Sequence, residues 1–159
     1  MEQEIKSIRS RAGVFLFKQT EDKEEWFSIA SDFGGFNRIE FSIHSNDYFA
    51  EAGWIKLPEF LDYLEDHLPS YIDKAMSPLL NFAKMSGYFN ELEQSELMFG
   101  FGLNVIFLEP SFTTVNRWSF ELDFTTSNKN DHLENVDGYG RWFVTFDGDC
   151  IRGIRRESW

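Results

Sequence analysis

The sequence has a single cysteine and no long apolar run. Cys150 alone excludes an intrachain disulfide and fits a reducing compartment. The longest nearly uncharged run, Leu97–Leu108, is too short to span a bilayer. The N-terminal residues, MEQEIKSIRSR, lack the apolar stretch of a signal peptide. We therefore expect a cytoplasmic protein that makes no membrane contact.

Recognisable catalytic and metal motifs are also missing. The sequence contains no P-loop, GxGxxG or GxSxG motif, and His44, His67 and His132 lack metal-ligand spacing. Asp147-Gly148-Asp149 resembles an acidic metal dyad, but these residues are also what a tight hairpin turn needs. We expect no cofactor, no metal and no catalytic residue. A glycosidase-like carboxylate pair stays open, because its separation is set in three dimensions.

Basic residues are few: 15 Lys and Arg stand against 27 Asp and Glu, for a net charge of −12. The imbalance is concentrated in residues 21–68, which hold twelve acids and three bases, whereas both ends of the chain are slightly basic. A negative field repels nucleic acid and anionic membranes and speeds the encounter with a cationic partner. We expect no nucleic-acid binding.

Aromatic residues are abundant, with eighteen Phe, five Trp and five Tyr. Together with 42% hydrophobic residues, they supply a core and exclude the composition of a disordered chain. A length of 159 residues fits one domain, so residues 1–159 are predicted to fold as a single unit.

Two kinds of periodicity predict the secondary structure. An apolar stripe from Leu57 to Leu68 predicts a helix with Pro58 in its first turn, and Ser77-Pro78 predicts the start of a second helix that Gly87 closes. Alternating segments predict the strands, and Asp147-Gly148 predicts a hairpin turn between the last two. The predicted strands are Val14–Lys18, Trp26–Ala30, Arg38–His44, Leu97–Leu108, Val115–Thr126, Trp142–Phe146 and Cys150–Arg155.

The predicted fold is α+β: a mostly antiparallel sheet of about six to seven strands, with two helices from the middle of the chain packed on one face. Leu97–Leu108 and Val115–Thr126 should be adjacent, central and antiparallel. Phe101 and Phe120 should lie in the core.

Two acidic segments are candidates for partner binding. The polar segment Thr125–Tyr139 is longer than a hairpin needs, and long loops in compact domains are commonly functional. It contributes Asp131, Glu134 and Asp137. The second choice is the polar face of the first predicted helix, with Asp62, Glu65 and Asp66.

In size, acidity and α+β pattern the chain resembles the immunity proteins of bacterial polymorphic-toxin and contact-dependent growth inhibition systems. The resemblance implies stoichiometric binding to a cognate basic toxin domain, often a nuclease, and transfers no site residue. One alternative is a small enzyme or ligand-binding domain with an aromatic-lined pocket on the sheet. Another is a structural subunit whose acidity serves solubility.

Overall fold

A computed structural model describes residues 3–44, 51–87, 99–108, 118–128 and 140–158. Eight strands form one sheet in the order of the chain. The strands are β1 (Ile5–Ser10), β2 (Gly13–Gln19), β3 (Glu25–Phe33), β4 (Phe36–His44), β5 (Phe99–Leu108), β6 (Ser119–Asn128), β7 (Gly140–Asp147) and β8 (Cys150–Ser158).

A 36-residue helix, α1 (Glu51–Ser86), lies between β4 and β5 in the chain. β4 and β5 run parallel, and each of the other neighbouring pairs is antiparallel. A parallel pair needs a long crossover connection, which α1 supplies. The fold is therefore α+β with a mostly antiparallel sheet, as predicted.

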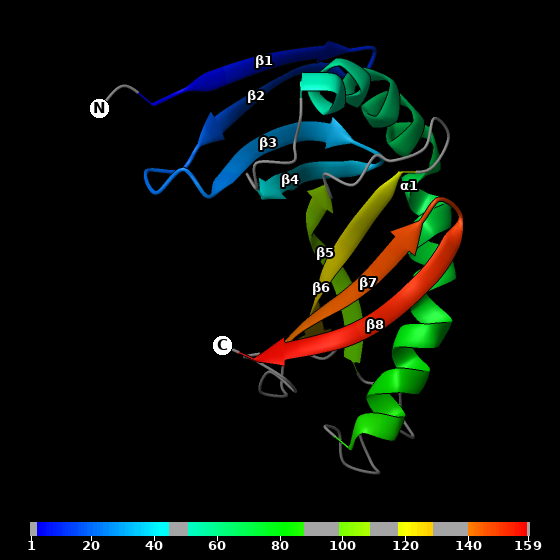
Figure 1. The fold of residues 1–159 in the computed structure, drawn as a ribbon. Coiled ribbons are helices and arrows are strands. Elements are labelled where there is room, and N and C mark those ends of the chain that lie inside the picture. Colours follow the sequence, from blue (N-terminus) through cyan, green and yellow to red (C-terminus); the bar gives the residue numbers. More distant parts are fainter. Residues whose placement is uncertain (1–2, 45–50, 88–98, 109–117, 129–139, 159) are drawn as a thin grey trace.

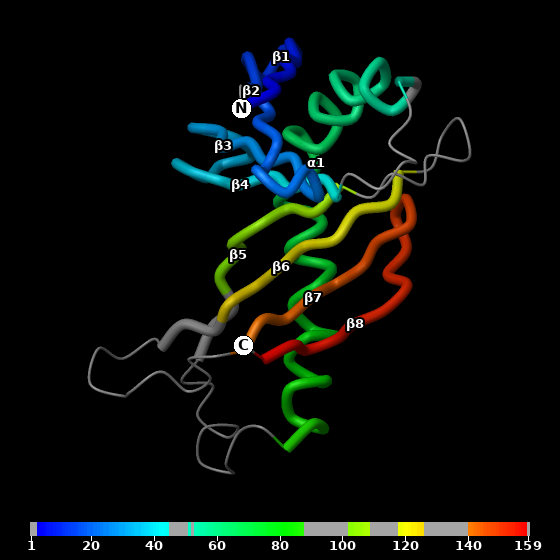
Figure 2. The backbone as a smooth tube through the Cα atoms, turned by 60° about the vertical axis from the view of Figure 1, so that its left-hand side comes forward, coloured from blue at the N-terminus to red at the C-terminus, as the bar shows by residue number. Residues whose placement is uncertain are grey.

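The sheet and the helix bend together. Figure 1 shows β1–β4 in the upper part of the molecule and β5–β8 below them at an angle. The first part of α1 lies beside β1 and β2, and its last part runs behind β5–β8 (Figure 2). One helix therefore covers the same face of both halves of the sheet.

The predicted number of helices was wrong. Instead of two helices, the described residues contain one, which continues through Pro58, Pro69 and Pro78. A proline inside a helix costs about 3 kcal/mol. Here the apolar stripe keeps its helical spacing past each proline, and burial of that stripe offsets the cost. The buried residues of the stripe are Leu57, Phe60, Leu61, Leu64, Leu68, Tyr71, Ala75, Leu79 and Ala83.

The second predicted helix, from Ser77 to Gly87, is the last part of α1. Gly87 follows the last residue of α1 with a φ of 73°, so it closes the helix as predicted. Ser77 does not start a second helix, because it lies within α1. The bend of α1 in Figure 1 is typical of a helix that contains prolines.

The predicted number of strands was also too small, because β1 was missed. Ile5 and Ile8 are three residues apart and therefore lie on opposite faces of the strand, which hides the period of two. Ile8 is buried in the core and Ile5 is exposed.

The core lies between α1 and the sheet. Phe60 stacks on Trp118 with ring centroids 4.4 Å apart, and Tyr71 meets both Phe120 and Phe146 edge-on at 4.9 Å. Phe120 is fully buried, as predicted, whereas the side chain of Phe101 lies outside those described. β5 and β6 are adjacent, antiparallel and central, which confirms the prediction for these segments.

Candidate binding pocket on the open face of the sheet

The face of β6 that points away from α1 carries two buried carboxylates. Successive residues of a strand point to opposite faces. Since Phe120, Leu122 and Phe124 pack toward α1, Glu121 and Asp123 lie on the other face, which we call the open face. Nevertheless, Glu121 is only 7% exposed and Asp123 is 0% exposed.

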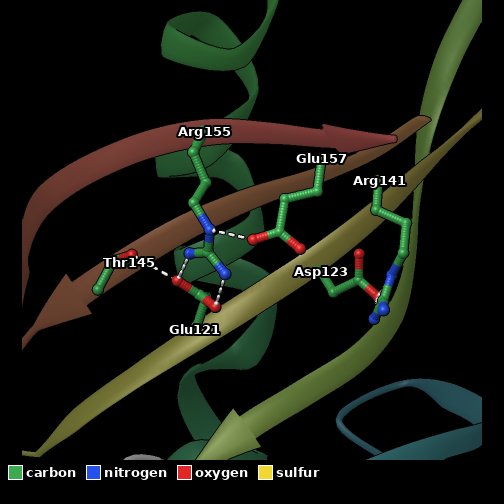
Figure 3. A network of polar contacts seen from close by, with 6 residues as sticks. All are labelled: Glu121, Asp123, Arg141, Thr145, Arg155 and Glu157. Carbon is green, nitrogen blue, oxygen red and sulfur yellow. Dashed lines mark hydrogen bonds and ion pairs between the residues drawn. The ribbon is translucent and has the colours of Figure 1, made fainter. Parts of the chain in front are cut away.

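Asp123 is paired with Arg141 of β7. The Nε of Arg141 donates to Oδ2 of Asp123 at 3.0 Å, and one of its terminal nitrogens donates to the same oxygen (Figure 3). The Asn104 side chain donates to Oδ2 at 3.3 Å. Oδ1 is buried, and no described group donates a hydrogen bond to it. Figure 3 shows this second oxygen directed away from Arg141.

Glu121 is held by Arg155 of β8. Both terminal nitrogens of Arg155 donate to the carboxylate, one of them at 2.8 Å, and Thr145 Oγ1 donates to it at 2.7 Å. The Nε of Arg155 donates to Glu157 at 2.9 Å (Figure 3). Hydrogen bonding to Glu121 raises the pKa of Arg155 above its ordinary value, although burial opposes the shift. Arg155 therefore remains a guanidinium cation.

Aromatic rings support both arginines. The guanidinium carbon of Arg155 lies 4.1 Å from the ring centroid of Phe143, and that of Arg141 lies 5.0 Å from the same centroid. Arg141 also lies 5.5 Å from the ring of Phe107, which is stacked on His44 at 5.7 Å. Cations are attracted to the faces of aromatic rings at these distances. The result is a row of alternating arginines and aromatic rings across β4–β8.

A cavity of about 470 Å³ opens over this row. Its volume lies within the usual range of ligand pockets, about 300–1,000 Å³. Its lining residues come from β3 and β4 as well as from β5–β8, so the cavity lies where the two halves of the sheet meet. We call this cavity the open-face pocket; its lining residues are Glu25, His44, Phe107, Leu108, Glu121, Arg141, Phe143, Arg155 and Glu157.

The residues predicted for partner binding lie elsewhere. Asp131, Glu134 and Asp137 are outside the described residues. The first residues of the segment predicted as a polar loop, from Thr125 to Asn128, belong instead to β6. Thr125 pairs with Arg141 of β7, and Thr126 pairs with Phe101 of β5, so the strand continues past the predicted start of the loop.

Two of the three predicted helix acids stabilise the fold. Asp62 Oδ1 accepts hydrogen bonds from the backbone N–H groups of Arg11 at 2.8 Å and Ala12 at 3.4 Å. Asp66 pairs with the Arg11 side chain at 2.9 Å. Both acids therefore attach the β1–β2 hairpin to α1. Glu65 is partly exposed.

The turn predicted at Asp147-Gly148-Asp149 joins β7 to β8, with Gly148 at a φ of 58°. Tyr71 donates to Asp149 at 3.0 Å, and this hydrogen bond, with the nearby Lys74, lowers the pKa of Asp149. The described part of the chain holds no group of three or more His, Cys, Asp or Glu that could bind a metal. Within that part, no helix is long and apolar enough to cross a membrane.

Sequence reasoning did not predict the residues that form the open-face pocket, although one alternative function includes an aromatic-lined pocket on the sheet. Its signal was present in β6, where Ser119, Glu121 and Asp123 share one parity on a strand predicted to be central. Comparisons with protein-family models, with curated proteins and with solved structures find no match to this chain. The geometry of the pocket and the distribution of charge must therefore support any functional proposal.

Proposed function

We propose that this protein is an acidic inhibitor of the immunity type, which binds and neutralises a cationic protein domain by stoichiometric protein–protein binding. A nuclease toxin is the expected class of partner, because a nuclease needs a cationic surface where it holds nucleic acid. The observation that carries the proposal is the open-face pocket, where carboxylates outnumber cations beside aromatic rings.

The pocket has the composition of a binding hot spot. Hot spots are desolvated centres with aromatic or arginine anchors, surrounded by residues that exclude water. Phe107 supplies apolar area, and Glu25 and Glu157 supply negative charge; Phe143 and Glu121 also line the pocket but are almost fully buried. A cationic group of a partner would find both in one place.

The exposed surface supports association with the same kind of partner. Acidic side chains are exposed along α1 and at the β2–β3 turn, and the whole chain has a net charge of −12. These exposed acids are Glu21, Asp22, Glu24, Glu51, Glu59, Asp66 and Asp73. Charges at the rim of an interface mainly raise the association rate, and salt screens them.

Asp131, Glu134 and Asp137 remain the first candidates for this electrostatic attraction, followed by Glu65. Asp62 and Asp66 are weaker candidates than the sequence indicated, because Arg11 already binds both of them. A partner would have to compete with this contact.

The test is co-expression with the product of the neighbouring gene, scored by cell survival, followed by calorimetry of the purified pair. We expect protection, one-to-one binding and an association rate that falls as salt is added. Reversing Asp131, Glu134 and Asp137 to Lys should slow association. Reversing Glu21, Asp22 and Glu24 at the β2–β3 turn changes the net charge equally, so it measures the effect of overall charge, and it should slow association less than reversal of the three candidates. A harmless neighbouring product, or no protection, would contradict the proposal.

The volume of the open-face pocket favours a second candidate, a domain that binds a small molecule between Phe107, Phe143 and the surrounding charges. A small ligand would raise the melting temperature of the free protein by mass action. If a set of small cationic metabolites raises it and no protein partner binds, this second function replaces the first.

A further inference from the structure

The open-face pocket has a surplus of negative charge. Its lining includes three carboxylates, Glu25, Glu121 and Glu157, and two guanidinium groups, Arg141 and Arg155. The buried Asp123 lies directly beneath Arg141 and adds a fourth carboxylate. Four carboxylates and two guanidinium groups leave a formal net charge of −2. A cation is therefore favoured in the cavity over an anion.

The hydrogen bonds of the two arginines also favour a cation over an anion in the cavity. Arg155 directs its Nε and both terminal nitrogens to Glu121 and Glu157, and Arg141 directs its Nε and one terminal nitrogen to Asp123. An anion would have to displace these carboxylates from their arginines. By contrast, a carboxylate has about four acceptor positions.

Acceptor positions remain for a guest that brings donors. Ser42 donates to one oxygen of Glu25, and Arg155 Nε donates to one oxygen of Glu157, so each carboxylate has a second oxygen able to accept. The unsatisfied Oδ1 of Asp123 is a further buried acceptor on this face.

The aromatic rings that line the cavity favour a guanidinium over other cations. The rings of His44 and Phe107 are stacked with an interplanar angle of 12°, and they stand beside the guanidinium of Arg141. A guanidinium is planar, stacks on aromatic faces and binds carboxylates through two parallel hydrogen bonds, whereas an ammonium is a compact point charge. The row of arginines and rings across β4–β8 therefore has the chemistry to accept one more guanidinium.

We propose that the open-face pocket receives one arginine side chain of the protein partner, with its guanidinium between Glu25 and Glu157 and its stem against His44 and Phe107. This inference rests on the proposed function, since it names the group through which a cationic partner is held. It places the centre of the interface on the open face of the sheet, opposite the face that α1 covers.

The pocket can be tested without the partner, with N-acetyl-arginine amide as the probe. In an NMR titration we expect it to shift the resonances of His44 and Phe107. The matched probe, N-acetyl-citrulline amide, has nearly the same shape without the charge and should not bind. Equal shifts with the two probes, or no shift at the pocket with the arginine probe, would overturn the inference.

Isosteric variants test the two carboxylates. Glu25→Gln and Glu157→Gln remove a charge and keep an acceptor for Ser42 and Arg155. Each should weaken binding of the arginine probe about tenfold, the equivalent of one charged hydrogen bond. Glu24→Gln, at the exposed β2–β3 turn, is the control and should bind as the unchanged protein does. Unchanged affinity in both pocket variants would contradict the assignment, and thermal melting confirms that each variant is folded.

Experiments with the toxin distinguish a failure of the arginine pocket from a failure of the inhibitor function. If the protein protects against its toxin while Glu25→Gln and Glu157→Gln protect and bind equally well, the inhibitor function stands and the arginine pocket is wrong. If the arginine probe binds as expected but the neighbouring gene encodes no toxin, the pocket stands and the immunity function is wrong. Loss of toxin affinity in both variants, together with competition by the arginine probe, supports both.

Discussion

Residues 119–124 of β6 are removed from water on both faces of the sheet, but by different interactions on each face. Toward α1, β6 presents Phe120, Leu122 and Phe124, each fully buried among other apolar side chains. On the open face, the same strand presents Glu121 and Asp123, which are buried beneath arginines and phenylalanines. One strand thus combines an apolar core with an ionic network.

The two kinds of burial have different energetic consequences. Burial of a large apolar side chain stabilises a fold by about 1.5–3 kcal/mol. A buried ion pair contributes little net stability, because desolvation offsets the attraction between the charges, yet removal of one partner leaves an uncompensated charge. The network on the open face therefore adds less net stability than the apolar face, although each of its buried charges depends on its partner.

The largest effect is expected on the helix-covered face. Phe120→Ala should lower the free energy of unfolding by about 3–5 kcal/mol, because it leaves a cavity between α1 and the sheet. Urea denaturation measures this loss. The control is Leu16→Ala, at a side chain that is 50% exposed, which should cost much less. A loss below about 1 kcal/mol for Phe120→Ala would show that this face is not the core.

On the open face, the decisive experiment is a double-mutant cycle between Arg141 and Asp123. Arg141→Met should cost about 3 kcal/mol, because it leaves the charge of Asp123 buried without its partner. Adding Asp123→Leu to Arg141→Met should recover most of that loss, since neither charge then remains. Urea denaturation of both single variants and of the double variant gives the coupling energy. A double variant no more stable than Arg141→Met would contradict the contrast between the two faces.

Local periodicity was enough to predict the strands from β2 to β8, the antiparallel β5–β6 pair and the helix end at Gly87. It failed to predict the continuity of α1, which depends on contacts with the distant sheet. Pro69 and Pro78 argue for a break in any isolated helix, and only the burial of Tyr71 and Leu79 against the sheet keeps α1 continuous.

The open-face pocket was missed for a related reason. Alternation in β6 indicates that Glu121 and Asp123 share a face, but it does not show whether that face is wet. Their burial depends on Arg141 and Arg155, which lie on two other strands, and alternation within β6 does not specify how those strands pair. Pairing between strands, rather than the pattern within one, determines this site.

Arg155 should show a smaller effect than Arg141, because its side chain is 46% exposed and that of Arg141 only 19%. Arg155→Ala should cost about 1 kcal/mol, since water can replace part of the lost contact with Glu121. Arg155→Lys should recover only part of the loss, because an ammonium cannot form the two parallel hydrogen bonds. Urea denaturation of both variants tests this. Full recovery by Lys would show that charge alone matters here.

The smallest effect is expected at Asp149, a carboxylate whose side chain is 69% exposed and which accepts a hydrogen bond from Tyr71 of α1. Its folded pKa is lowered by that hydrogen bond and by Lys74. Its stabilising contribution should therefore be complete above the ordinary pKa of an unfolded Asp, about 3.9, and should be lost as the pH falls through the lower folded value. Solvent screening keeps the contribution below about 1 kcal/mol. In urea denaturation at a series of pH values, Asp149→Asn should be slightly less stable than the unchanged protein at neutral pH and equally stable in acid. A difference that grows in acid would contradict the pKa shift. A difference as large as the loss caused by Arg141→Met would show that exposure does not distinguish Asp149 from the buried Asp123.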